Sequence, residues 1–429
     1  MKRSLTNMLS QVGKSSLRRA AALGKIVRSK YNRVFAVEKQ TPVLSLETSE
    51  PSSFTEGLDK ATEYLLRALV MLEKHLMEFP PAEGWQSKSG VLDDIAGLVF
   101  FTRKMRKHNE PRTVGFFGAQ NRGKSSLINE LLGLDLMPVA VTPMSSTAIY
   151  IKHDTSLERG CFNLSVQKVN WGHHFDKNLD LGDAQKTLIQ YGSRKGTASF
   201  EDVDRIEVRS NLGDSDVLCK GGVLIDTPGA EKGFEDEKRN KNDIDKALKV
   251  LETAHVVIFV ERADYLQGKS ATKLFKENLS KMRPLCVVNF RDEYETENEA
   301  DKDDEIRDKM HQNYGVQLQR TICVSAKEAK QAREGGNPLA GGLEDLVSAI
   351  SKELQSLEPQ QGIITCLQEL EEILQMPGVK NWQGHGKEKL QMHNLSFLAK
   401  SLEENRFSEE ERKIADQISV LAEKIEDLL

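Results

Sequence analysis

The chain of 429 residues alternates between short apolar runs and longer stretches in which apolar side chains recur every three or four positions. The short runs are rich in β-branched and aromatic residues, which is typical of strands buried on both faces of a parallel sheet. The longer stretches have the spacing of amphipathic helices. The alternation predicts an α/β fold with a doubly wound, mostly parallel sheet. We expect its strands at residues 113–118, 147–153, 205–210, 222–229, 255–263, 284–292 and 321–327.

Amphipathic helices flank this α/β region on both sides. The first carries an apolar stripe at near-heptad spacing and ends at Pro80-Pro81. A second follows at residues 91–107, and two more lie after Glu358. Because each apolar face needs a partner, helices from the N- and C-terminal sides are expected to pack into one α-helical neck bundle. Their apolar positions include Leu58, Ala61, Leu65, Ala68, Leu72, Leu76, Phe79, Ile363, Leu367, Leu370, Leu374, Ile414, Ile418, Leu421, Ile425 and Leu428.

These patterns predict four parts of the chain. They are a basic, flexible N-terminal segment (1–50), the N-terminal neck helices (51–110), the α/β domain (111–358) and the C-terminal neck helices (359–429). The α/β domain is long enough to bury a sizeable core of its own. An acidic run at residues 292–308 is expected to be a solvated insertion within it.

The net charge of −5 hides a strong asymmetry, because residues 1–33 contain nine Lys or Arg and no acidic residue. Three interpretations stay open: an amphipathic segment on an anionic membrane, an organelle transit peptide and a disordered basic arm. No apolar run approaches the length of a membrane span. We therefore expect a cytoplasmic protein, in solution or at a membrane surface, with organelle targeting still open.

The five cysteines are scattered and form no C-x-x-C pair, which indicates buried thiols in a reducing compartment. No H-E-x-x-H motif or cluster of His and Cys residues predicts a metal centre. The pair His173-His174 is expected to lie in a loop.

The sequence GFFGAQNRGKSSLINELLG (residues 115–133) contains the pattern G-x-x-x-x-G-K-[ST] between a predicted strand and a predicted helix. Gly118 and Gly123 let the backbone curl closely around a phosphate, to which the loop N–H groups and the helix N-terminus present positive charge. Lys124 can reach the β and γ phosphates, and the Ser125 hydroxyl can bind Mg²⁺. The pattern therefore predicts a phosphate-binding loop.

A second motif, Asp226-Thr227-Pro228-Gly229, directly follows an apolar run. An Asp at a strand end can hold a Mg²⁺-bound water, and the Gly can place its N–H on the γ-phosphate. After a phosphate-binding loop, this motif predicts the metal side of a nucleotide triphosphate site.

Two further motifs predict the base. In Asn289-x-x-Asp292, the carboxylate can accept two hydrogen bonds from guanine that adenine cannot offer. Phe290 stands where a Lys is usual, and its ring can cover the base by stacking. The tripeptide Ser325-Ala326-Lys327 can offer a backbone N–H to the guanine oxygen and a Lys stem beside the base.

The four motifs together predict a site for GTP or GDP with Mg²⁺, with an ATPase as the minor competitor. The expected nucleotide contacts are Gly118, Ala119, Gln120, Asn121, Arg122, Gly123, Lys124, Ser125, Ser126, Asp226, Gly229, Asn289, Asp292, Ser325, Ala326 and Lys327.

Over roughly residues 111–358, these motifs resemble those of the dynamin superfamily, including its bacterial members. The loop GAQNRGKSSLINELLG has Gln120 at the family's characteristic third position, and LMPVAVTPMSSTAIYIKH (136–153) is similar to the family's first switch. The resemblance implies GTP hydrolysis, with Ser145 closing on Mg²⁺ alongside Ser125 and Asp226. By position, Thr142, Ser146 and Thr147 are rivals of Ser145 for that role.

The resemblance also implies how the reaction is catalysed. Small GTPases often have a Gln directly after D-x-x-G, but here the residue is Ala230. In dynamins the phosphate-loop Gln helps to orient the water, which points to Gln120, and the next residue, here Asn121, helps to hold a monovalent cation. The expected catalytic residues are Gln120, Lys124 and Ser145. For Arg122 two interpretations stay open, an arginine finger acting within its own chain or a solvated loop residue.

Two functions compete at this stage. The resemblance implies a mechanoenzyme whose G domains self-associate with nucleotide and whose neck swings, acting on a membrane that residues 1–33 can contact. A full stalk needs more chain than residues 359–429, so we expect a truncated form or a compact relative without a stalk. The alternative is a regulatory GTPase switch acting on a protein or ribosomal partner. No nucleic-acid partner is predicted, because no RNA-binding module is visible.

Overall fold

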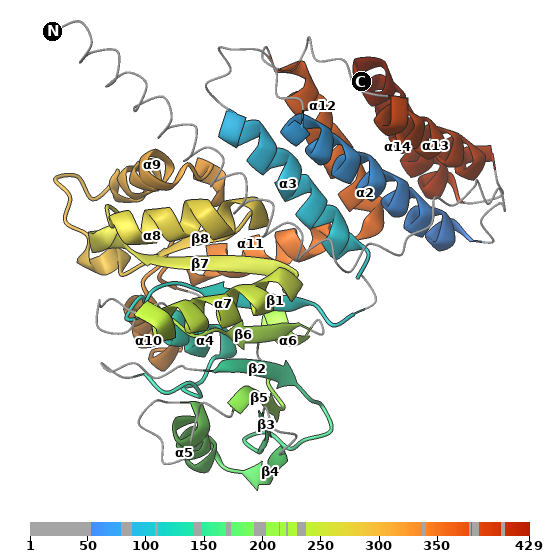
Figure 1. Ribbon diagram of the computed structural model, residues 1–429. Coiled ribbons are helices and arrows are strands. Elements are labelled where there is room, and N and C mark those ends of the chain that lie inside the picture. The colour runs from blue at the N-terminus through green and yellow to red at the C-terminus, as the bar shows by residue number, and fades with distance from the viewer. Residues whose placement is uncertain are drawn as a thin grey trace, which may run out of the picture. The chain divides into compact units, whose positions relative to one another are not determined.

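The computed structural model describes residues 53–78, 88–107, 110–139, 147–168, 173–192, 203–213, 215–219, 222–229, 237–336, 340–376, 379, 386–404 and 408–429. Within them, helices flank a mixed sheet. Long helices also precede the first strand and follow the last strand in the sequence, and they form a second group (Figure 1). Among the described helices, none combines the length and the hydropathy needed to cross a membrane.

The sheet has nine strands among the described residues, in the order β4-β3-β5-β2-β6-β1-β7-β8-β9. The pairings from β6 through β1, β7 and β8 to β9 are parallel, as is the pairing of β2 with β5. Antiparallel pairings join β2 to β6, and β3 to both β4 and β5. The strands are β1 Thr113–Phe117, β2 Ala148–His153, β3 Phe162–Lys168, β4 His173–Leu179, β5 Val203–Ser210, β6 Val223–Asp226, β7 Val256–Arg262, β8 Leu285–Asn289 and β9 Thr321–Cys323.

Helices cover both faces of the central strands, as predicted for a doubly wound sheet. Alternate residues of β1 enter different clusters, because successive side chains of a strand point to opposite faces. Phe116 packs with residues of α4 and α11, whereas Phe117 packs with residues of α7 and α9. These helices and their neighbours are α4 Lys124–Leu132, α5 Leu181–Gly192, α6 Asp216–Cys219, α7 Glu237–Thr253, α8 Lys269–Leu274, α9 Lys302–Tyr314, α10 Ala326–Glu334 and α11 Leu343–Ser356.

The seven predicted strands are present, but the sequence analysis missed β3 and β4. In β3, polar residues alternate with buried Phe162, Leu164 and Val166, and β4 exposes most of its length. Neither strand has the continuous apolar run of a doubly covered strand. The predicted loop at His173-His174 is therefore wrong, because both residues begin β4. Among the described residues, no group of three or more His, Cys, Asp or Glu side chains could hold a metal ion.

The long helices share one hydrophobic cluster, to which helices before the first strand and helices after the last strand both contribute. This confirms that the N- and C-terminal helices pack together. Of the predicted apolar positions, those within α2 are buried, and Phe79 lies outside the described residues. The sequence analysis missed α13, which exposes Leu390 and Phe397 and so has apolar residues on more than one face. The helices are α2 Phe54–Glu78, α3 Lys88–Met105, α12 Pro359–Gln375, α13 Gly386–Glu404 and α14 Glu409–Leu428.

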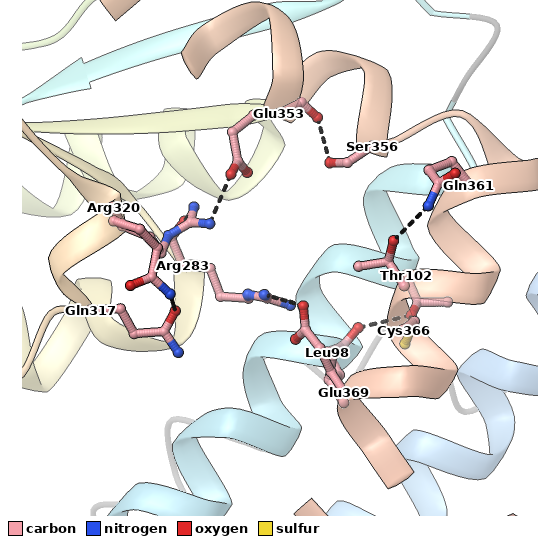
Figure 2. Close-up of polar contacts among 12 residues, drawn as sticks. Leu98, Thr102, Arg283, Gln317, Arg320, Glu353, Ser356, Gln361, Cys366 and Glu369 are labelled. Atoms are coloured by element: carbon pink, nitrogen blue, oxygen red, sulfur yellow. Dashed lines mark hydrogen bonds and ion pairs between the residues drawn. The ribbon is translucent and has the colours of Figure 1, made fainter. Parts of the chain in front are cut away.

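Charged side chains join this bundle to the α/β part (Figure 2). Arg283, which precedes β8, pairs with Glu369 of α12 at 2.7 Å, and beside this junction Arg320 pairs with Glu353 of α11, within the α/β part, at 2.8 Å. These residues help to line a cavity of about 570 Å³. The buried Lys104 of α3 donates from Nζ to the backbone oxygen of His255 at 2.9 Å, and its burial lowers its pKa.

His255 is a buried titratable group beside this junction. Its Nδ1 accepts a hydrogen bond from the backbone N–H of Thr113 at 3.1 Å, while Nε2 lies 3.4 Å from the backbone oxygen of Lys107. Nδ1 is therefore unprotonated in the folded protein. Burial lowers the pKa of His255 from 6.5 to about 4.

This lowered pKa predicts a loss of stability in acid. His255 binds its proton near pH 6.5 in the unfolded chain and only near pH 4 in the folded chain. The contribution of His255 to the free energy of unfolding is therefore complete above pH 6.5 and declines as the pH falls toward 4. Denaturant unfolding of wild type and His255→Gln, at constant ionic strength from pH 8 to 4, should show the steeper acid loss in wild type. Parallel curves of unfolding free energy against pH for the two proteins would contradict the lowered pKa of His255.

Candidate functional site

The phosphate-binding loop connects β1 to α4, as the sequence predicted. A Cβ added to Gly118 would collide with the backbone oxygen of Val260 in β7. Gly123 has φ 78°, in the left-handed region, and a Cβ there would collide with the side-chain amide of Asn289. Each glycine thus permits a close approach that no larger residue could make.

Lys124 opens α4 with its side chain buried and folded back over the loop. Its Nζ donates to the backbone oxygens of Gly118 at 3.0 Å and Ala119 at 3.3 Å. Burial lowers the pKa of Lys124, with the nearby Asp226 acting in the opposite direction. The next two loop contacts on the sequence, Ser125 and Ser126, lie in the first turn of α4. The Lys124 ammonium group therefore lies inside the curve of the loop that would hold the phosphates.

The proposed metal ligands from two motifs meet here. Ser125 Oγ donates to Asp226 Oδ2 at 3.0 Å, and Asp226 is fully buried at the end of β6. A hydroxyl and a carboxylate oxygen at this separation fit the ligand preference of Mg²⁺, which takes oxygen donors and keeps several waters. Ser145 and its rivals Thr142 and Ser146 lie outside the described residues. The remaining rival, Thr147, is buried and donates to the backbone oxygen of Val203 at 3.4 Å.

Gln120 lies beside Gly229 of the second motif. A Cβ on Gly229 would come 3.2 Å from Gln120 Cγ and 2.9 Å from Lys124 Nζ. The structure thus brings the expected water-orienting side chain, the loop cation and the γ-phosphate glycine together. Asn121, at the position that helps to hold a monovalent cation in dynamins, is exposed and has φ 58°. Ala230 lies outside the described residues.

Asn289 connects the phosphate loop to the base motifs. Its Oδ1 accepts from the backbone N–H of Ala326 at 3.1 Å, and its Nδ2 donates to the backbone oxygen of Arg122 at 3.3 Å. Since Ser325 N–H donates to Gly341, the N–H of Lys327, in the first turn of α10, is the tripeptide's remaining backbone donor for a base oxygen.

Asp292 is held as an ionised acceptor. Its Oδ1 accepts from Ser325 Oγ at 2.7 Å, and its Oδ2 lies 3.4 Å from Lys327 Nζ. Burial raises the pKa of Asp292, but the hydrogen bonds from Ser325 and Lys327 outweigh it, so the pKa lies below its ordinary value. A carboxylate held in this way can accept from two donors of a base.

Phe290 adopts φ 62°, which is rare for a bulky side chain and costs about 1–3 kcal/mol. Its ring lies beside Gly123, and the Arg262 guanidinium lies 3.9 Å from the ring centroid. Arg262 is itself held by Asp264 and Glu293, each at 2.8 Å. One face of the ring is thus covered by a fixed cation, and stacking of the ring on a base stays a prediction.

Arg122 differs from what the sequence suggested. Its side chain is only 3% exposed, and its Nε lies 2.7 Å from Oε1 of Glu261, which is 1% exposed. The solvated interpretation is therefore wrong, and the guanidinium already has an anionic partner within the protein. The sequence analysis missed Glu261, although one acidic residue in the apolar run HVVIFVERA is a signal, because a buried charge requires a partner.

The acidic run at 292–308 is only partly the solvated insertion that was predicted. Its second half enters α9, where Ile306 is fully buried, and Tyr294 is 6% exposed. Both side chains join the cluster beneath α7 and β7. The acids occupy the outer face of an element that covers the sheet.

Comparison with known proteins decides which family carries this site. Residues 114–292 match the profile described as "Dynamin family". This part of the chain belongs to the dynamin family. The dynamin-family region begins in β1 and ends at Asp292, so it contains the phosphate loop, the Asp226 motif and the Asn289 motif.

Two curated relatives are similar to about half of this chain. The chain is 25% identical over 219 residues to "Dynamin-like protein 2" of Campylobacter jejuni, covering 51% of this chain and 31% of that protein. It is 24% identical over 245 residues to "Bacterial dynamin-like protein" of Nostoc punctiforme, covering 52% and 33%. The chain thus matches about a third of the length of these relatives. A structure entitled "An oligomerised bacterial dynamin pair provides a mechanism for the long range sensing and tethering of membranes" aligns with 94% of this chain and 55% of its own, at 16% identity and a TM-score of 0.44.

The close approach between Gly123 and Asn289 in the dynamin-family region can be tested with a matched control. In Gly123→Ala, the new Cβ would displace the Asn289 amide, so affinity for GDP should fall by more than about tenfold. Gly133→Ala is the matched control, because Gly133 also has positive φ, at 70°, but nothing lies within 4 Å of its Cβ position. Equal nucleotide affinities in the two variants, measured by titration of a fluorescent GDP, would contradict the close approach.

Proposed function

We propose that the chain binds GTP with Mg²⁺ and hydrolyses it to GDP and phosphate. The observation that carries this proposal is the hydrogen-bonded junction at Asn289, which ties the loop of Lys124 to the carboxylate motif of Asp292. One end of the site then suits phosphates and metal, and the other suits a base with two adjacent donors. Guanine has such an edge and adenine does not.

The side chains divide the reaction among them. Lys124 and the loop N–H groups hold the phosphates, and a cation in this water-poor position stabilises charge that develops on the leaving phosphate. Mg²⁺, held through Ser125 and Asp226, would supply further neutralisation of that charge. Gln120 lies next to Gly229 and can orient the attacking water. Ser145 is proposed to close the metal site from the first switch.

We further propose that hydrolysis is coupled to G-domain self-association and to remodelling at a membrane. Three features support this: the dynamin-family region, the helices that pack beside it from both sides of the sequence, and the nine basic residues of segment 1–33. The division of the chain into a G domain at 111–358 and a neck from 51–110 and 359–429 belongs to the same proposal. A basic amphipathic segment gains about 1 kcal/mol per Lys or Arg near an anionic membrane.

The alternative is a regulatory GTPase that cycles as a monomer on a protein or ribosomal partner. It would use the same nucleotide site, so the site alone favours neither function. The two differ in whether specific activity depends on protein concentration or on anionic liposomes.

Base selection is tested at Asp292. In Asp292→Asn, one oxygen can still accept from Ser325, but the new amide donates where the carboxylate accepted. Loss of a hydrogen bond to a charged group is worth about 1.5–3 kcal/mol, so GTP affinity should fall at least about tenfold. Affinity for xanthosine triphosphate should rise. Asp303→Asn is the control, since Asp303 lies outside the motif and pairs with Arg291, one of the motif's two variable positions. Unchanged GTP and xanthosine triphosphate affinities would disprove the base assignment.

Catalysis is tested at Gln120. Gln120→Ala should bind GTP within a few-fold of wild type and lose about 10² to 10⁴ in turnover, because only the orientation of the water is lost. Wild-type specific activity should rise with enzyme concentration, and further with anionic liposomes. If specific activity is flat in both titrations and Gln120→Ala is as active as wild type, the monomeric alternative replaces the proposal.

A further inference from the structure

The phosphate loop is attached to strand β7 at two points. Gly118, the first residue of the loop, packs against the backbone oxygen of Val260 so closely that no Cβ fits. Four residues later, the Arg122 side chain reaches Glu261, the neighbour of Val260 on the same strand, at 2.7 Å. The short segment between these attachments includes Gln120. Its position is therefore fixed from both ends by one strand.

Glu261 is built to receive this arginine. Its Oε2 accepts from the Tyr314 hydroxyl of α9 at 3.1 Å, and its Oε1 accepts from the backbone N–H of Arg262 at 3.0 Å. Burial raises the pKa of Tyr314, so its hydroxyl keeps the proton that it donates. The ring of Tyr265 lies 4.6 Å from the Arg122 guanidinium. The carboxylate is therefore held by two hydrogen-bond donors in addition to the ion pair with Arg122.

We propose that Arg122 is a positioning residue, which sets the height of Gln120 over the phosphates through its ion pair with Glu261. The proposal rests on the GTPase activity proposed above. It gives the arginine a role that is neither an arginine finger nor surface charge, since the guanidinium is paired and buried. The backbone oxygen of Arg122 also accepts from Asn289, so the same residue links the catalytic segment to the base side.

Stability alone does not account for such a pair. Replacing a buried ion pair by apolar residues of similar size is often neutral or stabilising, whereas removal of one partner is strongly destabilising. If the ion pair serves to position Gln120, removal of both charges together should leave folding stability nearly unchanged. The same change should still reduce the rate of GTP hydrolysis. The double variant Arg122→Met/Glu261→Met separates these two requirements.

The test measures GTP turnover, GDP affinity and the unfolding midpoint for wild type, Arg122→Met, Glu261→Gln and Arg122→Met/Glu261→Met. Misplacement of a catalytic group by about 1 Å can cost about 10²-fold in rate. We expect kcat to fall about tenfold to a hundredfold in all three variants, without additivity, because each breaks the same attachment. The Michaelis constant for GTP should change only a few-fold. The double variant should unfold near the wild-type temperature.

Three outcomes would overturn the proposal. Wild-type or faster turnover in Glu261→Gln, together with loss in Arg122→Met, would indicate that the freed arginine acts as a finger. Lowered unfolding midpoints with unchanged kcat would indicate a structural pair only, and unchanged values throughout would mean that the attachment is not used. Arg320→Met/Glu353→Met, an ion pair at the junction with the bundle, is the control and should leave kcat unchanged. An inactive wild-type protein would instead refute the proposed GTPase activity.

Discussion

The side-chain amide of Asn289 is the contact on which the site depends. It donates to the phosphate loop at Arg122 and accepts from the backbone of Ala326, so that loops separated by about half the chain are held together. The amide lies where any side chain at position 123 would stand, which is why the loop needs glycine there. Parallel strands make this possible, since their carboxyl ends meet at one edge of the sheet. The residues proposed to bind the phosphates, the metal and the base thereby lie together at this edge.

Several charged side chains around this edge of the sheet are buried. Lys124, Asp226, Glu261 and Arg122 are all largely removed from water, and each has a partner of opposite charge or a hydrogen-bond partner within the protein. Groups fixed in this way need little rearrangement when charge develops on a phosphate, which is the general advantage of a preorganised site. Away from this site, Arg283 pairs with Glu369 of α12 and so joins the α/β part to the helix bundle, and Arg320 pairs with Glu353 of α11 beside that junction (Figure 2). Ion pairs of the same kind thus occur both at the proposed nucleotide site and at the junction with the helix bundle.

The sequence predicts the parts of the structure whose physics is local. Continuous apolar runs such as residues 255–263 predict buried strands, and the glycine pattern predicts the loop. Strands β3 and β4 were missed because a half-exposed strand keeps polar residues on one face, and α13 was missed because Leu390 and Phe397 are exposed. The pair of Arg122 with Glu261 joins positions that are 139 apart in the numbering, a distance that no local pattern reveals. Phe290 at a position usual for Lys was visible, but its partner Arg262 was not.

Selection of guanine over adenine tests the central claim most directly. The measurement is displacement of a fluorescent GDP from the nucleotide-free wild-type protein by GTP and by ATP, with Mg²⁺ present. The account predicts that ATP requires at least about 10²-fold higher concentration, because a site built to hydrogen-bond a partner rejects an analogue that lacks it. Lys124→Ala should bind neither nucleotide, since the buried cation within the loop is removed. Equal displacement by ATP and GTP would contradict the account, and so would full nucleotide binding by Lys124→Ala.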